Sequence, residues 1–348
     1  MNQTLALVDT PSNANARAVL GVMVLGAVCL LIDLLVGARS IDTGTDTYVY
    51  ASFFSALSHH GSVATRFEPV FYYLSVLLAS TGMGLNAYQG CLFAVMIGTV
   101  VVATRKYYDY LQSDGSYLTF LTASLMFLFL SPVMSNASIN VVRQGLASLL
   151  VFAALLAFHQ RQWRSFVFWG LMATGFHYSS LLYLIFAPAL LFRERTQRLI
   201  AVAAFIAYCS GLTMLLVRVL VPAAYTLVMS YEALSTYRTG VRLDFAVFSL
   251  FWYLLPYVLS SFVHEPARQL IKRGTAVYMV LLLPFFAVGW GSFSNRYLLP
   301  SWLSVSLMMA AIVCNSRLLP LRNPLLIRMG LVAASGVFYF YVSRGLVV

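Results

Sequence analysis

The chain has 348 residues, of which 61% are hydrophobic and only 9% charged, and its mean hydropathy is +0.83. This composition is typical of an integral membrane protein with many crossings, and it excludes a separate soluble domain. We therefore treat residues 1–348 as a single integral membrane domain. The net charge of +11 does not indicate nucleic-acid binding, because the basic residues are scattered between apolar segments. The four cysteines show no CxxC or Cys/His spacing, so neither a disulfide framework nor a metal site is expected.

Apolar segments recur along the whole chain. The first, residues 18–36, is too long for the apolar part of a cleaved signal peptide, so we expect it to remain as a signal anchor. Residues 69–79 provide about half of the roughly 20 residues that a crossing needs, which predicts a half-helix or re-entrant segment. The other apolar segments are 86–104, 117–130, 141–158, 165–176, 178–192, 199–220, 245–263, 275–290, 297–314 and 329–342. The sequence thus predicts an all-α bundle with about 11 transmembrane helices.

The basic residues set the expected orientation. Five short connectors hold 13 of the 22 Lys and Arg residues. All five can be cytoplasmic only if the N-terminus is inside and residues 69–79 do not cross, which places the C-terminus outside. A crossing at 69–79 is the alternative, and it would move Arg105 and Lys106 to the outer face. In the first arrangement, residues 37–68 and 222–244 form the outer loops.

The outer side then carries more arginines and carboxylates than topology alone predicts, which indicates an anionic ligand. Arg143, in "NVVRQGLASLL", falls in the first turn of a helix that enters from outside, where free N–H groups and the helix dipole already favour an anion. The planar guanidinium suits phosphate because it donates two parallel hydrogen bonds. The alternative is a structural arginine that reaches the lipid headgroups or pairs with Glu68 or Asp46.

Three further positions are unusual for such an apolar chain. His177, in "GFHYSS", lies between two arginine-flanked apolar segments, so we expect a hairpin with His177 at its outer tip and at the floor of a cavity open to the outside. Arg296, in "GSFSNRYLLPSW", is expected in the first turn of a helix, as Arg143 is. The outer loop 222–244 alternates Tyr225, Tyr231 and Tyr237 with Arg238 and Arg242, which suits a sugar site or an interfacial aromatic belt.

The segment "VVRQGLASLLVFAALLAFHQRQWRSFVFWGLMATGFHYSSLLYL" is similar to the central signature of the EpsG family of Wzy-type polysaccharide polymerases. The signature is an arginine, a small-residue helix, a basic turn and a second helix that ends in Phe-His. "DTYVYASFF" followed by "RFEPVFYYL" resembles the first outer loop of that family, and "NRYLLP" resembles its later arginine–tyrosine element.

The resemblance implies a metal-independent, cofactor-free glycosyltransferase at the periplasmic face of a bacterial inner membrane, with a GT-C-like helical fold. It would join oligosaccharide repeats linked to undecaprenyl diphosphate, with one lipid-linked oligosaccharide as donor and another as acceptor. Membrane lipid and a chain-length regulator are the other expected partners. Arg143 and Arg296 would stabilise the leaving diphosphate, with Arg238 or Arg242 as a clamp. Glu68 or His177 would act as general base if burial brings its pKa towards neutrality, and Glu68 is preferred. The expected substrate-binding residues are Asp46, Tyr48, Asn140, Gln144, Tyr237, Arg238, Arg242 and Tyr297.

Other functions remain open from the sequence. An O-antigen ligase would use the same donor with a different acceptor. A lipid-linked oligosaccharide flippase or other transporter would carry polar groups near mid-membrane and internal repeats, neither of which is evident here. A membrane O-acyltransferase could use His177 with a carboxylate, but the outer arginines would then have no clear role. A structural or assembly subunit would need no active site.

The expected orientation can be tested with single cysteines at Gly115 and Thr239, labelled in intact cells with a membrane-impermeant reagent. We expect labelling at Thr239 and none at Gly115, because the two positions belong to connectors on opposite sides of the membrane. Labelling of both positions from the same side would overturn the topology.

Overall fold

The computed structural model describes residues 11–230 and 239–345, with side chains from residue 18 onward. In these ranges the chain is helical, apart from turns, loops and one isolated bridge between Val263 and Ser316. This confirms the predicted all-α class. The helices are α1 (Pro11–Gly37), α2 (Thr47–His60), α3 (Pro69–Ser80), α4 (Leu85–Leu111), α5 (Tyr117–Leu130), α6 (Pro132–Ile139), α7 (Val142–His159), α8 (Trp163–Phe176), α9 (Ser180–Ile185), η1 (Ala187–Leu191), α10 (Glu194–Cys209), α11 (Leu212–Leu220), α12 (Pro222–Met229), α13 (Leu243–Leu259), η3 (Ser260–Phe262), α14 (Ala267–Val288), η4 (Ser294–Leu298), α15 (Leu299–Cys314) and α16 (Pro324–Ser343).

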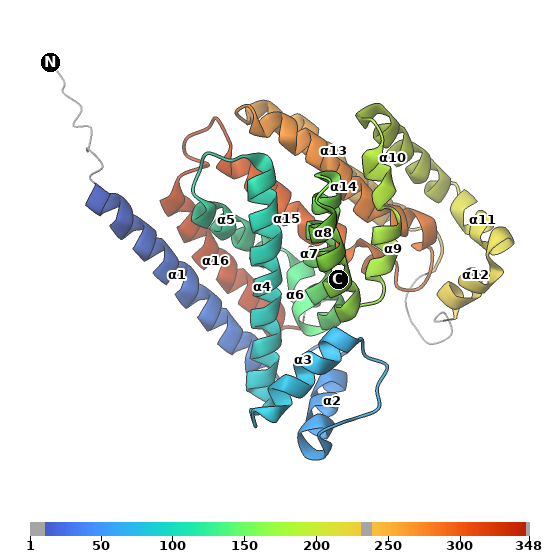
Figure 1. Cartoon of the computed structure of the whole chain (residues 1–348), viewed down its shortest axis with the longest axis horizontal. Helices are drawn as coiled ribbons and strands as arrows, with labels where there is room; N and C mark the ends of the chain where they lie inside the picture. The colour runs from blue at the N-terminus through green and yellow to red at the C-terminus, as the bar shows by residue number, and fades with distance from the viewer. Residues whose placement is uncertain (1–10, 231–238, 346–348) are drawn as a thin grey trace.

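Helix α7 is the centre of the bundle (Figure 1). It packs against α4, α8, α14 and α15, and nearly all of its residues are buried. A helix that is apolar all round belongs in an interior, and its many small residues let neighbouring helices approach closely. At Gly145, helix α6 comes very close to α7: a Cβ there would lie 2.7 Å from the carbonyl oxygen of Ala137 on α6.

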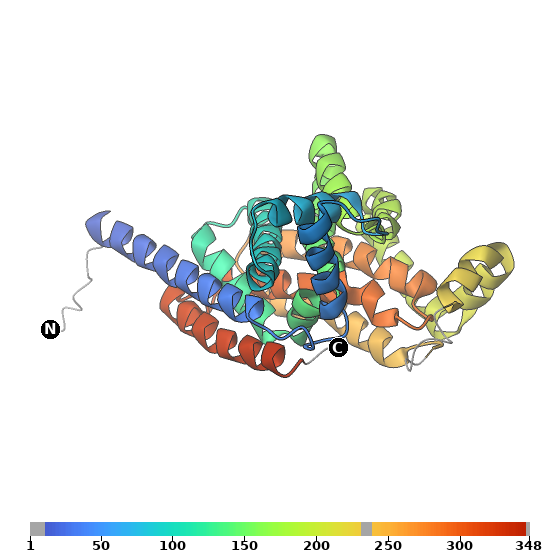
Figure 2. The ribbon, with the colours of Figure 1, turned by 90° about the horizontal axis from the view of Figure 1, so that it is seen from below.

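The edges of the bundle are more exposed. Helices α1 and α16 lie side by side at one edge, while α11 and α12 lie at the opposite edge (Figures 1 and 2). Their outward side chains are large and apolar, for example Leu34 on α1 and Leu220 on α11. Such a surface is suited to lipid and not to water.

The number of membrane-spanning helices differs from the expected 11. In the described part of the chain, seven helices are long and apolar enough to cross a membrane, or up to nine if two sharply bent pairs each count as one span. Helices α5 and α6 meet at 82°, and α10 and α11 at 83°. Pro132 explains the first bend, because it cannot continue α5 and instead starts α6, which Ser131 caps. The segments at 165–176 and 178–192 form the expected hairpin. Helices α8 and α9 are, however, too short to be counted as membrane-spanning helices.

The two expected outer loops are partly helical. Residues 37–68 contain α2, and residues 222–244 contain α12. The short α3 has 12 residues and covers one end of the bundle, where it contacts α2 and α8 (Figure 1). This agrees with the half-helix expected at 69–79. Helices α2 and α3 lie at the end of the bundle where α7 begins (Figure 1), and Glu68 is the residue just before α3.

The close contact at Gly145 provides a test of the packing. We expect Gly145→Ala to destabilise the protein by about 1–3 kcal/mol, because the added methyl group forces α6 away from α7. Gly98→Ala on α4 is the matched control, since its Cβ would meet no atom within 4 Å. Thermal unfolding in detergent measures both. Equal melting temperatures for the two variants would contradict the packing described here.

Candidate functional site

Glu68 is held at a sharp entry into α3. It is the residue before the helix, its backbone is extended (φ −67°, ψ 151°), and Pro69 occupies the first helical position. Proline favours both features, since it disfavours a helical conformation in the residue before it and fits the first turn itself. The Glu68 side chain does not cap its own helix. Its carboxylate is therefore available to other elements.

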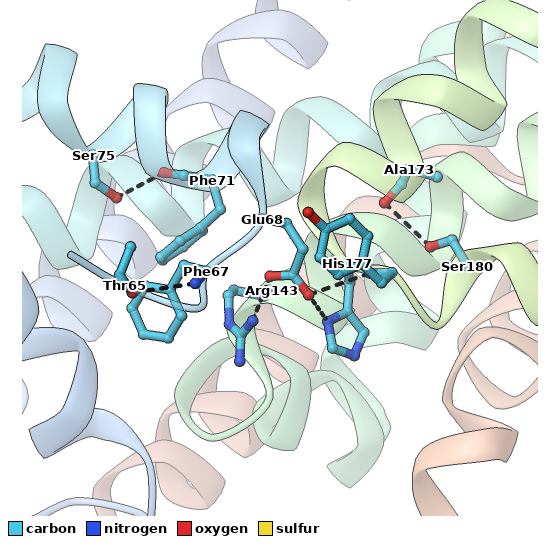
Figure 3. Close-up of polar contacts among 10 residues, drawn as sticks. Thr65, Phe67, Glu68, Phe71, Ser75, Arg143, Ala173, His177 and Ser180 are labelled. Carbon is cyan, nitrogen blue, oxygen red and sulfur yellow. Dashed lines mark hydrogen bonds and ion pairs between the residues drawn. The ribbon is translucent and has the colours of Figure 1, made fainter. Parts of the chain in front are cut away.

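Three groups from two other parts of the chain converge on this carboxylate (Figure 3). A terminal nitrogen of Arg143 donates a hydrogen bond to Oε2 and forms an ion pair with it. On Oε1, the Nδ1 atom of His177 lies at 2.7 Å and the backbone N–H of Tyr178 donates at 3.2 Å. The Glu68 side chain is only 3% exposed. Glu68 thus joins α3, the start of α7 and the turn between α8 and α9.

These contacts determine the charge state of Glu68. Burial raises the pKa of the carboxyl, but the hydrogen bond from His177 and the charge of Arg143 more than offset burial and lower the pKa from 4.5 to about 2. The carboxylate is therefore ionised and a weak base, contrary to the expectation that burial brings its pKa towards neutrality. An ionised carboxylate only accepts hydrogen bonds, so Nδ1 of His177 carries the proton. In a neutral imidazole, Nε2 is then the acceptor.

The position of His177 depends on a close helix crossing. It follows the last residue of α8 in an extended conformation (φ −158°, ψ 120°), and its backbone N–H donates to the carbonyl of Ala173 at 2.9 Å. At Gly175 a Cβ would lie 2.4 Å from Cγ2 of Val70, so only glycine lets α8 approach the start of α3 this closely. His177 is 25% exposed. Its second ring nitrogen points away from Glu68 (Figure 3).

Arg143 lies in the first turn of α7, as predicted. Its guanidinium stacks over the ring of Phe67, 4.4 Å from the centroid, and 23% of the side chain is exposed. One terminal nitrogen faces Glu68, and the other points away from the carboxylate on the same side as the free nitrogen of His177 (Figure 3). The pairing with Glu68 is the contact expected if Arg143 is a structural arginine. It holds the arginine in place and still leaves donors for a ligand.

Arg296 is held by the residue next to Arg143. It lies in the 3₁₀ helix η4, which precedes α15, and not in the first turn of an α-helix as expected. Gln144 donates to the backbone carbonyl of Arg296 at 2.5 Å, and the hydroxyl of Tyr183 donates to the carbonyl of Tyr297 at 3.0 Å. Gln144 and Tyr183 are both buried. Two consecutive carbonyls of η4 are therefore fixed to α7 and α9.

The guanidinium of Arg296 is less constrained than its backbone. It lies over the ring of Phe293, 4.3 Å from the centroid, and 3.9 Å from a carboxylate oxygen of Asp46. The side chains of Arg296 and Asp46 are 41% and 33% exposed. This is a loose, solvent-accessible ion pair, which contributes little to stability and can exchange Asp46 for another anion.

Asn140 fixes the loop that carries Asp46. Its Oδ1 accepts from the backbone N–H of Thr45 at 2.7 Å, and its amide nitrogen donates to Oδ1 of Asn136 at 3.0 Å. The hydroxyl of Thr47 donates to the carbonyl of Ile139 at 3.0 Å. The side-chain amides of Asn140 and Gln144 are thus engaged with the protein. Their expected role in contacting substrate stays a prediction.

Other predicted site residues lie apart from this cluster. Tyr48 is 63% exposed and faces a groove with His59 and His60. Arg242 makes two hydrogen bonds to Asp244, at 3.0 Å and 2.6 Å, just before α13. Tyr237 and Arg238 lie outside the described residues. Within 11–230 and 239–345, no three His, Cys, Asp or Glu side chains come close enough to hold a metal ion.

Sequence reasoning missed Tyr50 and Tyr183. Tyr50, on α2, packs against Phe71 and against Phe67, the ring over which Arg143 lies. Burial raises the pKa of Tyr50, although the charge of Arg143 opposes this, so the phenol stays neutral beside the arginine. The inward spacing of Tyr50, Phe54 and Leu57 on α2 is a signal that identifies Tyr50 as buried. No sequence signal identifies Tyr183.

The buried carboxylate predicts a pH-dependent stability. We expect Glu68→Gln to destabilise the protein by about 3 kcal/mol at neutral pH, because it leaves the charge of Arg143 without a partner. The folded pKa is depressed, so this contribution is complete above pH 4.5 and is lost as the pH falls towards about 2. The difference in melting temperature between the wild-type protein and the variant in detergent should therefore narrow as the pH falls from 5 to 3.

Glu194→Gln is the matched control. Glu194 pairs with Arg198 and Arg273 at 3.3 Å each, but it is 54% exposed, so its loss should change stability by about 1 kcal/mol or less. If Glu68→Gln is as stable as Glu194→Gln at pH 7, the electrostatic account of the cluster is wrong.

Comparison with known proteins places this cluster in a family. No curated protein and no solved structure is similar enough to the chain to count as a match. The family model described as "EpsG family" matches residues 22–345. The match covers Glu68, Arg143, His177 and Arg296 and confirms the resemblance seen in the sequence. The chain therefore belongs to the EpsG family, which suggests a membrane protein of the polysaccharide-polymerase type.

Proposed function

We propose that the protein is a polysaccharide polymerase of the bacterial inner membrane. It joins oligosaccharide repeat units carried on undecaprenyl diphosphate, and its reaction centre is the Glu68–His177–Arg143 cluster together with Arg296, facing the periplasm. The observation that carries the proposal is the ionised Glu68 carboxylate, which holds a histidine and an arginine side by side. Family membership supports the reaction type.

The two arginines bind the diphosphate of the donor lipid. Arg143 is fixed by Glu68 at the positive end of α7, and Arg296 is connected to the next residue of α7 through Gln144. The diphosphate replaces Asp46 beside Arg296, which the loose 3.9 Å pair permits. Two guanidinium groups stabilise the negative charge that grows on the leaving diphosphate.

His177 is the general base in this proposal. Because Nδ1 donates to Glu68, Nε2 is free to accept the proton of the acceptor sugar hydroxyl. The acceptor oxygen then bonds to the anomeric carbon of the donor, and the bond from that carbon to the diphosphate oxygen breaks. Undecaprenyl diphosphate leaves with the bonding electron pair, and His177 holds the proton as an imidazolium.

Glu68 takes a supporting role that differs from the one preferred on sequence grounds. With a pKa of about 2 it is too weak a base to accept a proton from a hydroxyl group. Its negative charge instead stabilises the imidazolium and sets the tautomer of the ring, as a carboxylate does beside other catalytic histidines. The same carboxylate positions Arg143.

The proposal is tested by incubating purified protein with a synthetic lipid-diphosphate-linked repeat unit, without metal ions or sugar nucleotides. We expect a ladder of products that differ by one repeat. Arg143→Ala and Arg296→Ala should each reduce the rate by about a hundredfold or more, as loss of a charge-stabilising donor does. His177→Gln should reduce it by about 10²–10⁴-fold, because the general base is lost.

Arg218→Ala is the matched control. Arg218 is an exposed arginine on α11 whose guanidinium lies over the ring of Tyr225, 5.8 Å from the centroid, so its loss should not change the rate. Unchanged activity in both Arg143→Ala and Arg296→Ala would remove the diphosphate assignment. Movement of the lipid across vesicles without any ladder would identify a transporter instead.

A further inference from the structure

The first turn of α7 has no cap from its own N-cap side chain. The residue before the helix is Val141, whose side chain has no hydrogen-bonding atom. The first N–H groups of an α-helix have no acceptor within the helix and need one from elsewhere. Arg143 is the second residue of α7, so its backbone N–H belongs to this turn, while its guanidinium pairs with Glu68. A polar group from another element can therefore act on Arg143 at two places.

Tyr50 approaches this turn from α2. It is only 5% exposed, and its ring packs against Phe67 and Phe71 with centroid distances of 5.9 Å and 5.7 Å. The guanidinium of Arg143 lies 4.4 Å from the centroid of the same Phe67 ring. Phe67 is thus a common neighbour that brings the phenol and the guanidinium together.

The hydroxyl of Tyr50 lies close to two donors of Arg143, its backbone N–H and its guanidinium. The oxygen of a neutral phenol can accept hydrogen bonds from both. The Nε atom of Arg143 is buried without a hydrogen-bond partner in the described part of the chain. A buried donor on a charged group is costly to leave unsatisfied. An acceptor beside the same guanidinium therefore stabilises the buried side of the arginine.

The contacts of Arg143 divide between two acceptors. Glu68 takes one terminal nitrogen, and the other terminal nitrogen points away from the carboxylate (Figure 3). A single ion pair leaves a long side chain free to rotate about that contact. The hydroxyl of Tyr50 and the ring of Phe67 restrict this rotation, because they engage the backbone, the inner edge and the face of the guanidinium group.

Packing alone does not require a hydroxyl at this position. The other large inward side chains of α2 are Phe53, Phe54 and Leu57, which are purely apolar. Tyr50 is the one of these four that lies beside Arg143. Its polar atom therefore has a partner that a phenylalanine could not serve.

Helix α2 contacts the second arginine as well. Asp46, the N-cap residue of α2, lies 3.9 Å from Arg296. The backbone N–H of Tyr50 donates to the carbonyl of Asp46 at 3.2 Å, so the two residues are one helical turn apart, a rise of about 6 Å. The first turn of α2 thus carries a contact to each arginine of the candidate site.

We propose that Tyr50 is a positioning residue for Arg143. Its hydroxyl accepts from the first turn of α7 and from the guanidinium, and it thereby keeps the second terminal nitrogen of Arg143 directed towards the ligand. The proposal rests on the proposed function for the identity of that ligand, a diphosphate. The contact between Tyr50 and Arg143 does not depend on it.

Tyr50→Phe removes only the hydroxyl, and Tyr278→Phe is the matched control. Tyr278 is fully buried on α14, and its hydroxyl donates to the carbonyl of Ser249 at 3.3 Å. Both variants lose one buried hydroxyl, so we expect similar melting temperatures in detergent. In the polymerisation assay, only Tyr50→Phe should lower kcat, by about tenfold, because a hydrogen bond to a charged group is lost.

A second measurement reads Arg143 directly and needs no polymerisation. Phenylglyoxal modifies arginine side chains, and mass spectrometry gives the rate at each position. We expect Arg143 to react about tenfold faster in Tyr50→Phe than in the wild-type protein, because its buried side loses an acceptor. The rate at Arg195, an exposed arginine on α10, should stay the same and serves as the internal reference.

The outcomes separate this proposal from the proposed function. Faster modification of Arg143 in Tyr50→Phe alone supports the positioning role, even if the wild-type protein makes no polymer. Equal modification rates in Tyr50→Phe and the wild-type protein would overturn it. An equal rise in Tyr278→Phe would also overturn it, since the effect would then be a general loosening of the bundle.

Discussion

The buried carboxylate of Glu68 is the interaction on which the rest of the site depends. An ionised group that is only 3% exposed is stable inside a protein only when it is paired and hydrogen-bonded, and Glu68 receives both from Arg143, His177 and the N–H of Tyr178. This requirement draws the start of α3, the start of α7 and the end of α8 together at one point. Arg143 can therefore pair with Glu68 as a structural residue and still present its second terminal nitrogen to the ligand proposed above.

A second set of contacts extends this arrangement to Arg296. Gln144 and Tyr183 bind consecutive carbonyl groups of η4, so the backbone of the second arginine moves with α7 and α9. Asn140 fixes the loop before α2, and with it Asp46. Backbone positions around the site are thus rigid, whereas the side chains of Arg296 and Asp46 remain exposed and loosely paired. Rigid supports with one exchangeable ion pair suit the anion-binding role proposed for this site.

The sequence predicts the class of the fold and the main residues of the site better than their connections. Composition and apolar periodicity identify an all-α membrane protein, and the unusual charges identify Glu68, Arg143, His177 and Arg296. The order of the chain also predicts the hairpin that carries His177. The expected segment 117–130 coincides with α5, but the turn into α6 at Pro132 was not expected, and the break near Gly211 divides the expected segment 199–220; an apolar run alone does not reveal such bends. The roles of Gln144 and Tyr183 depend on contacts between residues far apart in the chain, which no local pattern encodes. The lowered pKa of Glu68 arises from the same long-range contacts.

The break between α5 and α6 has a consequence for the depth at which the chain enters α7. Helix α5 has 14 residues and rises about 21 Å, against a hydrocarbon core of about 30 Å, and α6 then turns by 82° across the bundle. The start of α7 therefore lies several ångströms below the level that a straight helix would reach. Seven of the eight residues of α6 are buried, so the chain enters α7 inside the bundle and not at its lipid-facing surface.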